Sequence, residues 1–174
     1  ADTPRVEAER VIAALGEMGK RTVMLTGDNA TVAASVAESV GLDEVRASLL
    51  PGDKLEVVNQ IKTDGARVAM VGDGINDTPA LAAADLGIAV GGLGSAQAME
   101  TADIVLLGAN MAQLPFAVRL SRFTNLLVRQ NITFSLLSKL IVAGIAFLGY
   151  FPLWLAVLAD MGVSLLVTLN GLRA

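Results

Sequence analysis

The 174-residue chain contains no cysteine and no histidine. Disulfide bonds, zinc sites built from these residues, and catalysis by a thiolate or an imidazole are therefore excluded within it. Basic residues are outnumbered by acidic ones, 13 to 17, which gives a net charge of −4 at pH 7. No basic patch interleaved with aromatic residues is present, which argues against nucleic acid as a partner. Any chemistry must use carboxylates, hydroxyls and amines.

Charge is rarest in the last quarter of the chain, where two apolar runs read NITFSLLSKLIVAGIAFLGYF and PLWLAVLADMGVSLLVTLNGL. Each run has roughly the 20 residues that an α-helix needs to cross a bilayer. The connecting GYFPLW carries no charge, whereas arginines flank the outer ends: Arg119, Arg122, Arg129 and Arg173. The positive-inside rule then predicts two membrane-spanning helices in contact with lipid, with both outer ends in the cytoplasm. A buried hairpin of a large soluble domain is the alternative.

Each apolar run contains one charged residue, Lys139 in the first and Asp160 in the second. An ionised acid inside a bilayer needs a partner, a bound cation or protonation. Counted from the turn near Phe151 and Pro152, Lys139 lies roughly 18–20 Å deep and Asp160 roughly 12 Å deep. The lysine stem can span that offset, so the two side chains are expected to form an ion pair when no cation is bound. A purely structural pair is the alternative.

The preceding part of the chain alternates helical and strand patterns. It opens with ADTPRVEAERVIAALGEMGK, which is typical of an amphipathic helix rather than of a signal peptide. The expected helices cover about 5–18, 30–40, 52–65, 76–85 and 95–102, and RTVMLTG, VRAS, ARVAMVGDG, LGIAV and DIVLL are expected strands. Continuous apolar strands separated by helices predict a doubly wound parallel α/β sheet. From residue 111 onward, helical periodicity is expected to continue without a break into the first span.

Two motifs that could bind phosphate and metal follow expected strands, where ligands of open α/β sheets bind. In MLTGDN, Thr26 offers a hydroxyl to an anionic oxygen, and Gly27 lets the backbone approach closely. In MVGDGINDTPAL, Asp73 and Asp77 flank a turn that contains Asn76, an oxygen-rich set that suits Mg²⁺.

A lysine completes this predicted site. Lys54 in LLPGDK begins an expected helix and could reach phosphate as a point charge. Each of these short motifs alone is typical of an ordinary turn. Their joint order and their placement after strands therefore carry the prediction.

Together, MLTGDN, PGDK and VGDGINDTPAL resemble the second, third and fourth motifs of the haloacid dehalogenase superfamily, in the form found in P-type ATPases. SLLSKL and DMGVSLLVTLNGLR are similar to the last two spans of the subfamily that exports zinc, cadmium and lead. The resemblance covers essentially the whole chain. It implies a haloacid dehalogenase-like domain without its first strand, followed by a transmembrane helical hairpin, in a bacterial plasma membrane.

The resemblance also implies roles for individual residues. Thr26, with Gly27 and Asp28 of the same motif, would hold a phosphoryl oxygen. Lys54 would stabilise the phosphoryl group. Asp73 would bind Mg²⁺, and Asn76 and Asp77 would support that site. Asp160 would bind the transported Zn²⁺, Cd²⁺ or Pb²⁺, with Lys139 as its built-in counter-ion. Copper exporters of the same superfamily lack this lysine–aspartate pair, so the resemblance favours zinc-type substrates.

The resemblance is incomplete in two ways. The phosphorylated aspartate of an Asp-Lys-Thr-Gly-Thr motif does not occur in this sequence, and Ala96 stands where an acid is expected. The actuator domain, the ATP-binding domain and the Cys-Pro-Cys helix are also absent, so they are the expected partners. The resulting layout is a partial phosphorylation domain over 1–110, a helical stalk over 111–130 and two membrane helices over 131–174.

Three functions fit this layout to different degrees. The leading hypothesis is the C-terminal part of a metal-exporting P-type ATPase, which would be inactive without the missing parts. The rival is a truncated, catalytically inactive fragment that is anchored in the membrane. A free-standing phosphatase would need an aspartate nucleophile at the end of a first strand, and no such residue is visible in the sequence.

Overall fold

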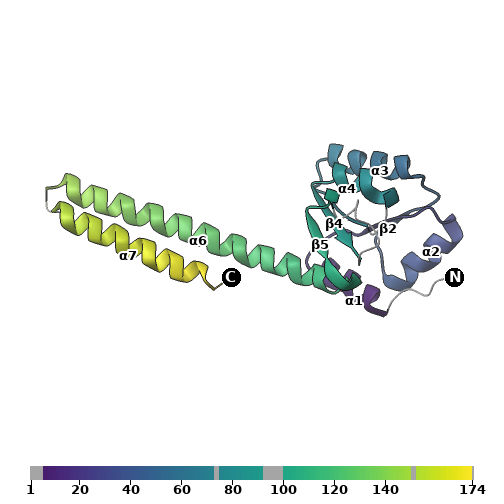
Figure 1. Ribbon diagram of the computed structural model, residues 1–174, viewed down its shortest axis with the longest axis horizontal. Helices are drawn as coiled ribbons and strands as arrows, with labels where there is room; N and C mark the ends of the chain where they lie inside the picture. The colour runs from purple at the N-terminus through teal and green to yellow at the C-terminus, as the bar shows by residue number, and fades with distance from the viewer. Residues whose placement is uncertain (1–5, 73–74, 92–99, 150–151, 174) are drawn as a thin grey trace. The chain divides into compact units, whose positions relative to one another are not determined.

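The computed structural model describes residues 6–72, 75–91, 100–149 and 152–173. It divides into two compact units, Ala1–Pro115 and Phe116–Ala174. Figure 1 shows strands and short helices in the first unit and a pair of long helices in the second. The two classes of structure that the sequence predicts are therefore both present.

The first unit alternates helices and strands as the sequence predicts. Its elements are α1 (Val6–Glu17), β1 (Val23–Leu25), α2 (Ala30–Val40), β2 (Glu44–Arg46), α3 (Pro51–Thr63), β3 (Ala69–Gly72), the 3₁₀ helix η1 (Ile75–Asp77), α4 (Thr78–Ala83), β4 (Leu86–Val90), β5 (Ile104–Leu106) and the 3₁₀ helix η2 (Leu107–Ala109). The helix expected over 95–102 falls mostly outside the described residues.

Every described strand pair is parallel, but the strands form two sheets. β1 pairs with β2, with Val23 opposite Glu44. β3, β4 and β5 form a second sheet in that order, with Ala69 opposite Leu86 and Ile88 opposite Ile104. The described backbone hydrogen bonds include none between β1 and β3. The parallel α/β class is confirmed, and its strands are divided between β1 and β3.

Local sequence explains where the helices begin and end. The Asn29 side chain accepts a hydrogen bond from the Val32 backbone N–H at 2.9 Å and so caps the start of α2. Gly41 ends that helix at φ 73°, a left-handed conformation that costs glycine little. Pro51 occupies the first turn of α3, and the Asp53 carboxylate accepts a hydrogen bond from the Leu50 N–H at 2.8 Å. These caps fix the loops that follow β1 and β2.

A small aliphatic core joins the two sheets. Its buried members come from α3, β3, α4 and β4: Val58, Met70, Ala80, Leu81 and Ala89. Leu25 of β1 is partly buried against the same cluster. Figure 1 shows α3 and α4 on one side of the strands and α1 and α2 on the other. The carboxyl ends of β1 and β3 are therefore held by one core, although no described backbone hydrogen bond joins them.

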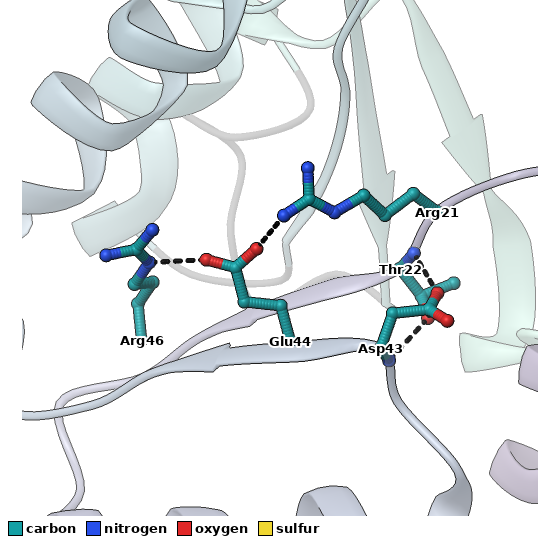
Figure 2. A network of polar contacts seen from close by, with 5 residues as sticks. All are labelled: Arg21, Thr22, Asp43, Glu44 and Arg46. Atoms are coloured by element: carbon teal, nitrogen blue, oxygen red, sulfur yellow. Dashed lines mark hydrogen bonds and ion pairs between the residues drawn. The ribbon is translucent and has the colours of Figure 1, made fainter.

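A polar network ties β1 to β2 at their amino ends (Figure 2). The Asp43 carboxylate accepts hydrogen bonds from the Thr22 backbone N–H and hydroxyl, each at 2.7 Å. The Glu44 carboxylate pairs with Arg21 and with Arg46. The bond from the Thr22 backbone lowers the pKa of Asp43, and the bond from Arg46 lowers that of Glu44. This network stabilises the strand pair at the end away from the motifs.

The Asp85 carboxylate stabilises the start of the sheet formed by β3, β4 and β5. Asp85 accepts a hydrogen bond from the Val68 backbone N–H at 2.8 Å, and this bond lowers the pKa of Asp85. Lys62 lies 3.5 Å from Asp85 and donates to the Ala83 carbonyl at 2.6 Å. These contacts hold the end of α3 against the loop that enters β4.

The second unit is an antiparallel helical hairpin formed by α6 (Gln113–Phe147), which begins in the first unit, and α7 (Leu153–Gly171). Both helices are long and apolar enough to cross a membrane. α6 continues without a break from the expected stalk into the expected span. Many large apolar side chains on both helices are exposed, among them Leu136, Leu140, Leu158 and Leu165. Exposed apolar surface of this kind is typical of helices that lie against lipid or other helices.

Candidate functional site

The loop that follows β1 is held by backbone hydrogen bonds from the loop that follows β2. The Thr26 N–H donates to the Arg46 carbonyl at 3.0 Å, and the Thr26 carbonyl accepts from Leu49 at 3.0 Å. The Ser48 N–H donates to the Asp28 carbonyl at 2.7 Å, with Ser48 itself at φ 57°. Because serine rarely adopts this left-handed conformation, the position indicates a loop whose geometry is imposed by its neighbours.

Within this loop the Thr26 side chain already has a partner. Its hydroxyl donates to the Asp28 carboxylate at 2.9 Å and accepts from the Asp28 N–H at 3.1 Å. Thr26 is half-buried, whereas Gly27 and Asp28 are exposed. A Cβ atom added to Gly27 would lie 3.4 Å from the Leu49 carbonyl oxygen. The hydroxyl therefore lies at the surface of a tight loop, where an anionic oxygen could replace the carboxylate.

Lys54 and Asp77 form a largely buried ion pair. Lys54 lies in the first turn of α3, and its Nζ is 2.7 Å from Asp77 Oδ1. Each side chain keeps only 15% of its surface exposed. The two residues are 23 positions apart, so the packing of α3 against η1 brings them together. The lysine is thus held at the carboxyl end of β3 with its charge neutralised by the protein.

Gly72 allows the Asp77 carboxylate to take this position. A Cβ atom at residue 72 would lie 2.9 Å from Asp77 Cβ and 3.0 Å from its Oδ2. Contacts this short would displace the aspartate, so the GDG turn needs glycine at this position. Asn76 lies beside Asp77 in η1 and is exposed. Asp73, the residue expected to bind Mg²⁺, lies outside the described residues.

The donor set fits a magnesium site that is completed by other groups. The described residues contain no cluster of three or more acidic side chains that could hold a metal alone. Mg²⁺ commonly uses only one or two carboxylates together with phosphate oxygens and water. Oxygen donors from Asn76 and Asp77 therefore suit Mg²⁺ bound together with a phosphoryl group.

The second site lies in the hairpin. Lys139 Nζ is 3.5 Å from Asp160 Oδ1, so the ion pair expected from the sequence is present. The two side chains keep 61% and 54% of their surface exposed, respectively. The remaining coordination positions of the carboxylate are therefore open to groups outside the two helices. The carboxylate is available as a ligand if the lysine moves.

Sequence reasoning missed several polar contacts. The Asn131–Asn170 hydrogen bond in the hairpin could have been found by the depth counting that paired Lys139 with Asp160. Ser48 and the Thr22–Asp43 contact gave no local signal, because both depend on how β2 packs beside β1. In α4, Thr78 lies inside a motif with stronger features and gave no separate signal; its buried hydroxyl has no hydrogen-bond partner among the described residues.

Known proteins resemble this chain over its whole length. Residues 1–85 match the haloacid dehalogenase-like hydrolase family. The chain is 52% identical, over 99% of its own length, to the Listeria monocytogenes protein named "Probable cadmium-transporting ATPase", of which it covers 24%. It is 45% identical over 99% of its length to the zinc-transporting ATPase of a Synechocystis species, again covering 24% of that protein.

A crystal structure of a related protein shows the same similarity. The chain superimposes on a zinc-transporting PIB-type ATPase in the E2·Pi state with a TM-score of 0.93 and 46% sequence identity, covering 99% of this chain and 28% of that one. The chain therefore spans about a quarter of the length of the relatives that it matches. It is homologous to the C-terminal part of cadmium- and zinc-transporting P-type ATPases.

Proposed function

We propose that this chain forms the C-terminal part of an ATP-driven exporter of Zn²⁺, Cd²⁺ or Pb²⁺. The observation that carries the proposal is the Lys139–Asp160 pair inside an apolar hairpin, on the same chain as the Thr26 and Lys54 motifs. An ionised acid in an apolar helix is energetically costly unless it has a charged partner or binds a cation. The phosphoryl motifs supply the matching energy source. Metal transport coupled to phosphoryl transfer accounts for both features.

In the first unit, the chain's residues would bind and neutralise a phosphoryl group as it passes from ATP to an aspartate outside this chain. Thr26 would exchange its hydrogen bond to Asp28 for one to a phosphoryl oxygen. Lys54 would turn from Asp77 toward the same group. Mg²⁺, held by Asp73 with support from Asn76 and Asp77, would neutralise phosphoryl oxygens. Because pairing with Asp77 holds Lys54 at the carboxyl end of β3 beforehand, only the lysine side chain would have to turn.

The divided sheet supports this reading. β1 and β3 share a core, yet each pairs with only one described strand. A parallel strand inserted between them would pair with both, and its carboxyl end would lie beside Thr26 and Lys54. We place the strand that carries the missing phosphorylated aspartate in this gap. The ATP-binding domain, the actuator domain and the Cys-Pro-Cys helix would come from the same absent part.

In the hairpin, Asp160 would bind the metal and Lys139 would neutralise the acid after the metal leaves. The Asp160 carboxylate would supply oxygen ligands while the metal is bound. Once the metal has left, the Lys139 ammonium would pair with the carboxylate, so that the acid is not left unpaired in the membrane. Both outer ends would lie in the cytoplasm, with lipid around the hairpin. Residues 1–110 would form the phosphorylation domain, 111–130 the stalk and 131–174 the two spans.

The test uses the complete transporter, meaning this chain joined to the N-terminal regions of its relatives. We expect zinc-stimulated ATP hydrolysis in the wild type and no phosphoenzyme in Asp73→Asn. Asp43→Asn is the matched control, because it changes a carboxylate at the opposite end of the strands. Normal phosphoenzyme in Asp73→Asn would contradict the assigned role. Absence of metal-stimulated hydrolysis in the wild type would favour the inactive-fragment reading.

A further inference from the structure

Two asparagines link the helices of the hairpin at the end remote from the turn. Asn170 of α7 donates to the Asn131 side-chain carbonyl at 2.8 Å, and Asn131 donates to the Val167 backbone carbonyl at 3.3 Å. Both side chains are half-buried between α6 and α7. A cavity of about 300 Å³ lies beside them, lined by Gln130, Asn131, Phe134, Leu166, Val167 and Asn170. The amides thus form a two-bond bridge between helices that are otherwise mostly apolar.

The bridge lies one step beyond the ion pair along both helices. Asn131 precedes Lys139 by eight residues, which is roughly 12 Å of helix, and Asn170 follows Asp160 by ten, roughly 15 Å. The turn near Pro152 joins the helices at the other end. The ion pair therefore lies between two connections, one covalent and one hydrogen-bonded.

The ion pair is poorly suited to fix how α7 lies along α6. Its 3.5 Å separation depends on a long, flexible lysine stem, and both side chains are more than half exposed. In the proposed function, the pair also breaks whenever a metal binds Asp160. Helices that relied on this pair alone could slide when the metal arrives.

The amide bridge lacks these weaknesses. Asparagine side chains are short and neutral, so their hydrogen bonds do not depend on pH and are not displaced by a cation at Asp160. Interhelical hydrogen bonds of this kind favour one alignment, because sliding would leave amide groups unpaired in apolar surroundings. The contact from Asn131 to the Val167 carbonyl adds a second, backbone-directed constraint.

We infer that Asn131 and Asn170 are positioning residues that keep Asp160 within reach of the Lys139 side chain in both the metal-bound and the metal-free hairpin. This inference rests on the proposed function for its effect on metal binding. The alignment itself does not depend on transport. The two parts can therefore be tested separately.

The alignment is tested in the chain itself. Because the sequence has no cysteine, Leu126→Cys and Leu172→Cys, both at exposed positions, can carry the only two spin labels. We expect one narrow distance distribution in the detergent-purified parent and a broader one in Asn131→Ala and in Asn170→Ala. Asn170→Leu, which keeps the side-chain volume, should broaden it as well. Combining both alanine changes should broaden it no further than Asn131→Ala, since the residues act as one bridge.

Thr168→Ala is the matched control. It removes a hydrogen bond of 2.9 Å to the Ser164 carbonyl, within α7 and at similar depth, without touching α6. The control should retain the narrow distribution. Equal distributions in the parent, the asparagine variants and the control would overturn the inference, because the bridge would then have no role in alignment.

The consequence for metal binding is tested in the complete transporter. We expect zinc affinity to fall by about three- to tenfold in Asn170→Ala, the size expected for one interhelical hydrogen bond, with folding and zinc stoichiometry retained. Thr168→Ala should bind zinc as the wild type does. Wild-type affinity in Asn170→Ala would contradict the positioning role. A wild type without metal-stimulated hydrolysis would instead contradict the proposed function and leave the spin-label result as the test of alignment.

Discussion

Both candidate sites of this molecule contain a lysine–aspartate pair, and the two pairs are built differently. Lys54 and Asp77 lie 2.7 Å apart with 15% of each side chain exposed. Lys139 and Asp160 lie 3.5 Å apart, and more than half of each side chain is exposed. The first pair lies between α3 and η1 of its own unit, close to Gly72. The second projects from a pair of helices into whatever surrounds them.

Exposure has opposite meanings in the two units. An exposed ion pair in water is well solvated and contributes little to stability. A charge exposed on an apolar helix lacks that solvation, so it requires further partners or a bound ion. The buried pair is therefore complete within this chain, and the exposed pair is incomplete. We expect substitutions in the first to lower the stability of this chain, in addition to their effect on the proposed phosphoryl site, and substitutions in the second to affect metal binding.

The largest expected effect tests the incomplete pair. In the complete transporter, Asp160→Ala should abolish zinc-stimulated turnover and lower the zinc bound per molecule, because a ligand is lost. Lys139→Ala should keep most of the zinc bound while disturbing release, because only the counter-ion is lost. Zinc stoichiometry on monodisperse, detergent-purified protein measures this. Full zinc occupancy in folded Asp160→Ala would leave only a structural ion pair.

The next effect tests the complete pair. Lys54→Met leaves the Asp77 carboxylate buried without its partner and should lower the free energy of unfolding of the first unit by about 3 kcal/mol. Lys54→Met combined with Asp77→Asn should recover much of that loss, since no charge then stays buried. Urea unfolding, monitored by hydrogen exchange of the β3 amides, measures this change in the free energy of unfolding. The exposed Lys20→Met is the control, and a similar loss there would show that burial of the pair is not the cause.

A smaller effect concerns Thr78, whose buried hydroxyl has no partner in the part of the chain that the structure describes. Its neighbour Asp77, by contrast, pairs with Lys54. Thr78→Val removes the hydroxyl while keeping the shape, and should stabilise the unit by about 1 kcal/mol. Thermal unfolding compared with Thr78→Ser gives the result. A destabilised valine variant would mean that the hydroxyl has a partner in solution.

The smallest effect uses Asp43, a carboxylate that accepts two hydrogen bonds from Thr22, as the reference. Because the pKa of Asp43 is lowered in the folded chain, its contribution to stability is present above the ordinary aspartate pKa of 3.8 and is lost as the pH falls through the lower, folded value. The midpoint temperature of thermal unfolding should therefore be higher in the wild type than in Asp43→Ala at pH 6. This difference should shrink toward pH 2. A difference that stays constant with pH would exclude this linkage.

Sequence patterns predicted most of the architecture. Apolar periodicity located the strands and helices to within a few residues, and helix depth counted from Pro152 paired Lys139 with Asp160. The same counting places Asn131 and Asn170 at similar depth, so their contact was also within reach. Helical rise is regular, which makes side-chain neighbours in a hairpin predictable from numbering alone.

The remaining contacts depend on packing between distant segments. Lys54 and Asp77 were both expected near the phosphoryl site, but their direct pairing depends on how α3 lies against η1. The left-handed Ser48 likewise follows from the three backbone hydrogen bonds that tie its loop to Thr26 and Asp28. Neither contact has a local sequence signal, because neither arises from neighbouring residues.

The divided sheet has a consequence for how this chain behaves when it is produced alone. β1 and β3 each present backbone groups without a described partner strand. Open strand edges attract any extended segment, including the same edge of another copy. Correct assembly with an inserted strand and aggregation between copies would therefore compete for the same N–H and C=O groups. Solubility of the first unit should rise when a segment that fills the gap is supplied during synthesis.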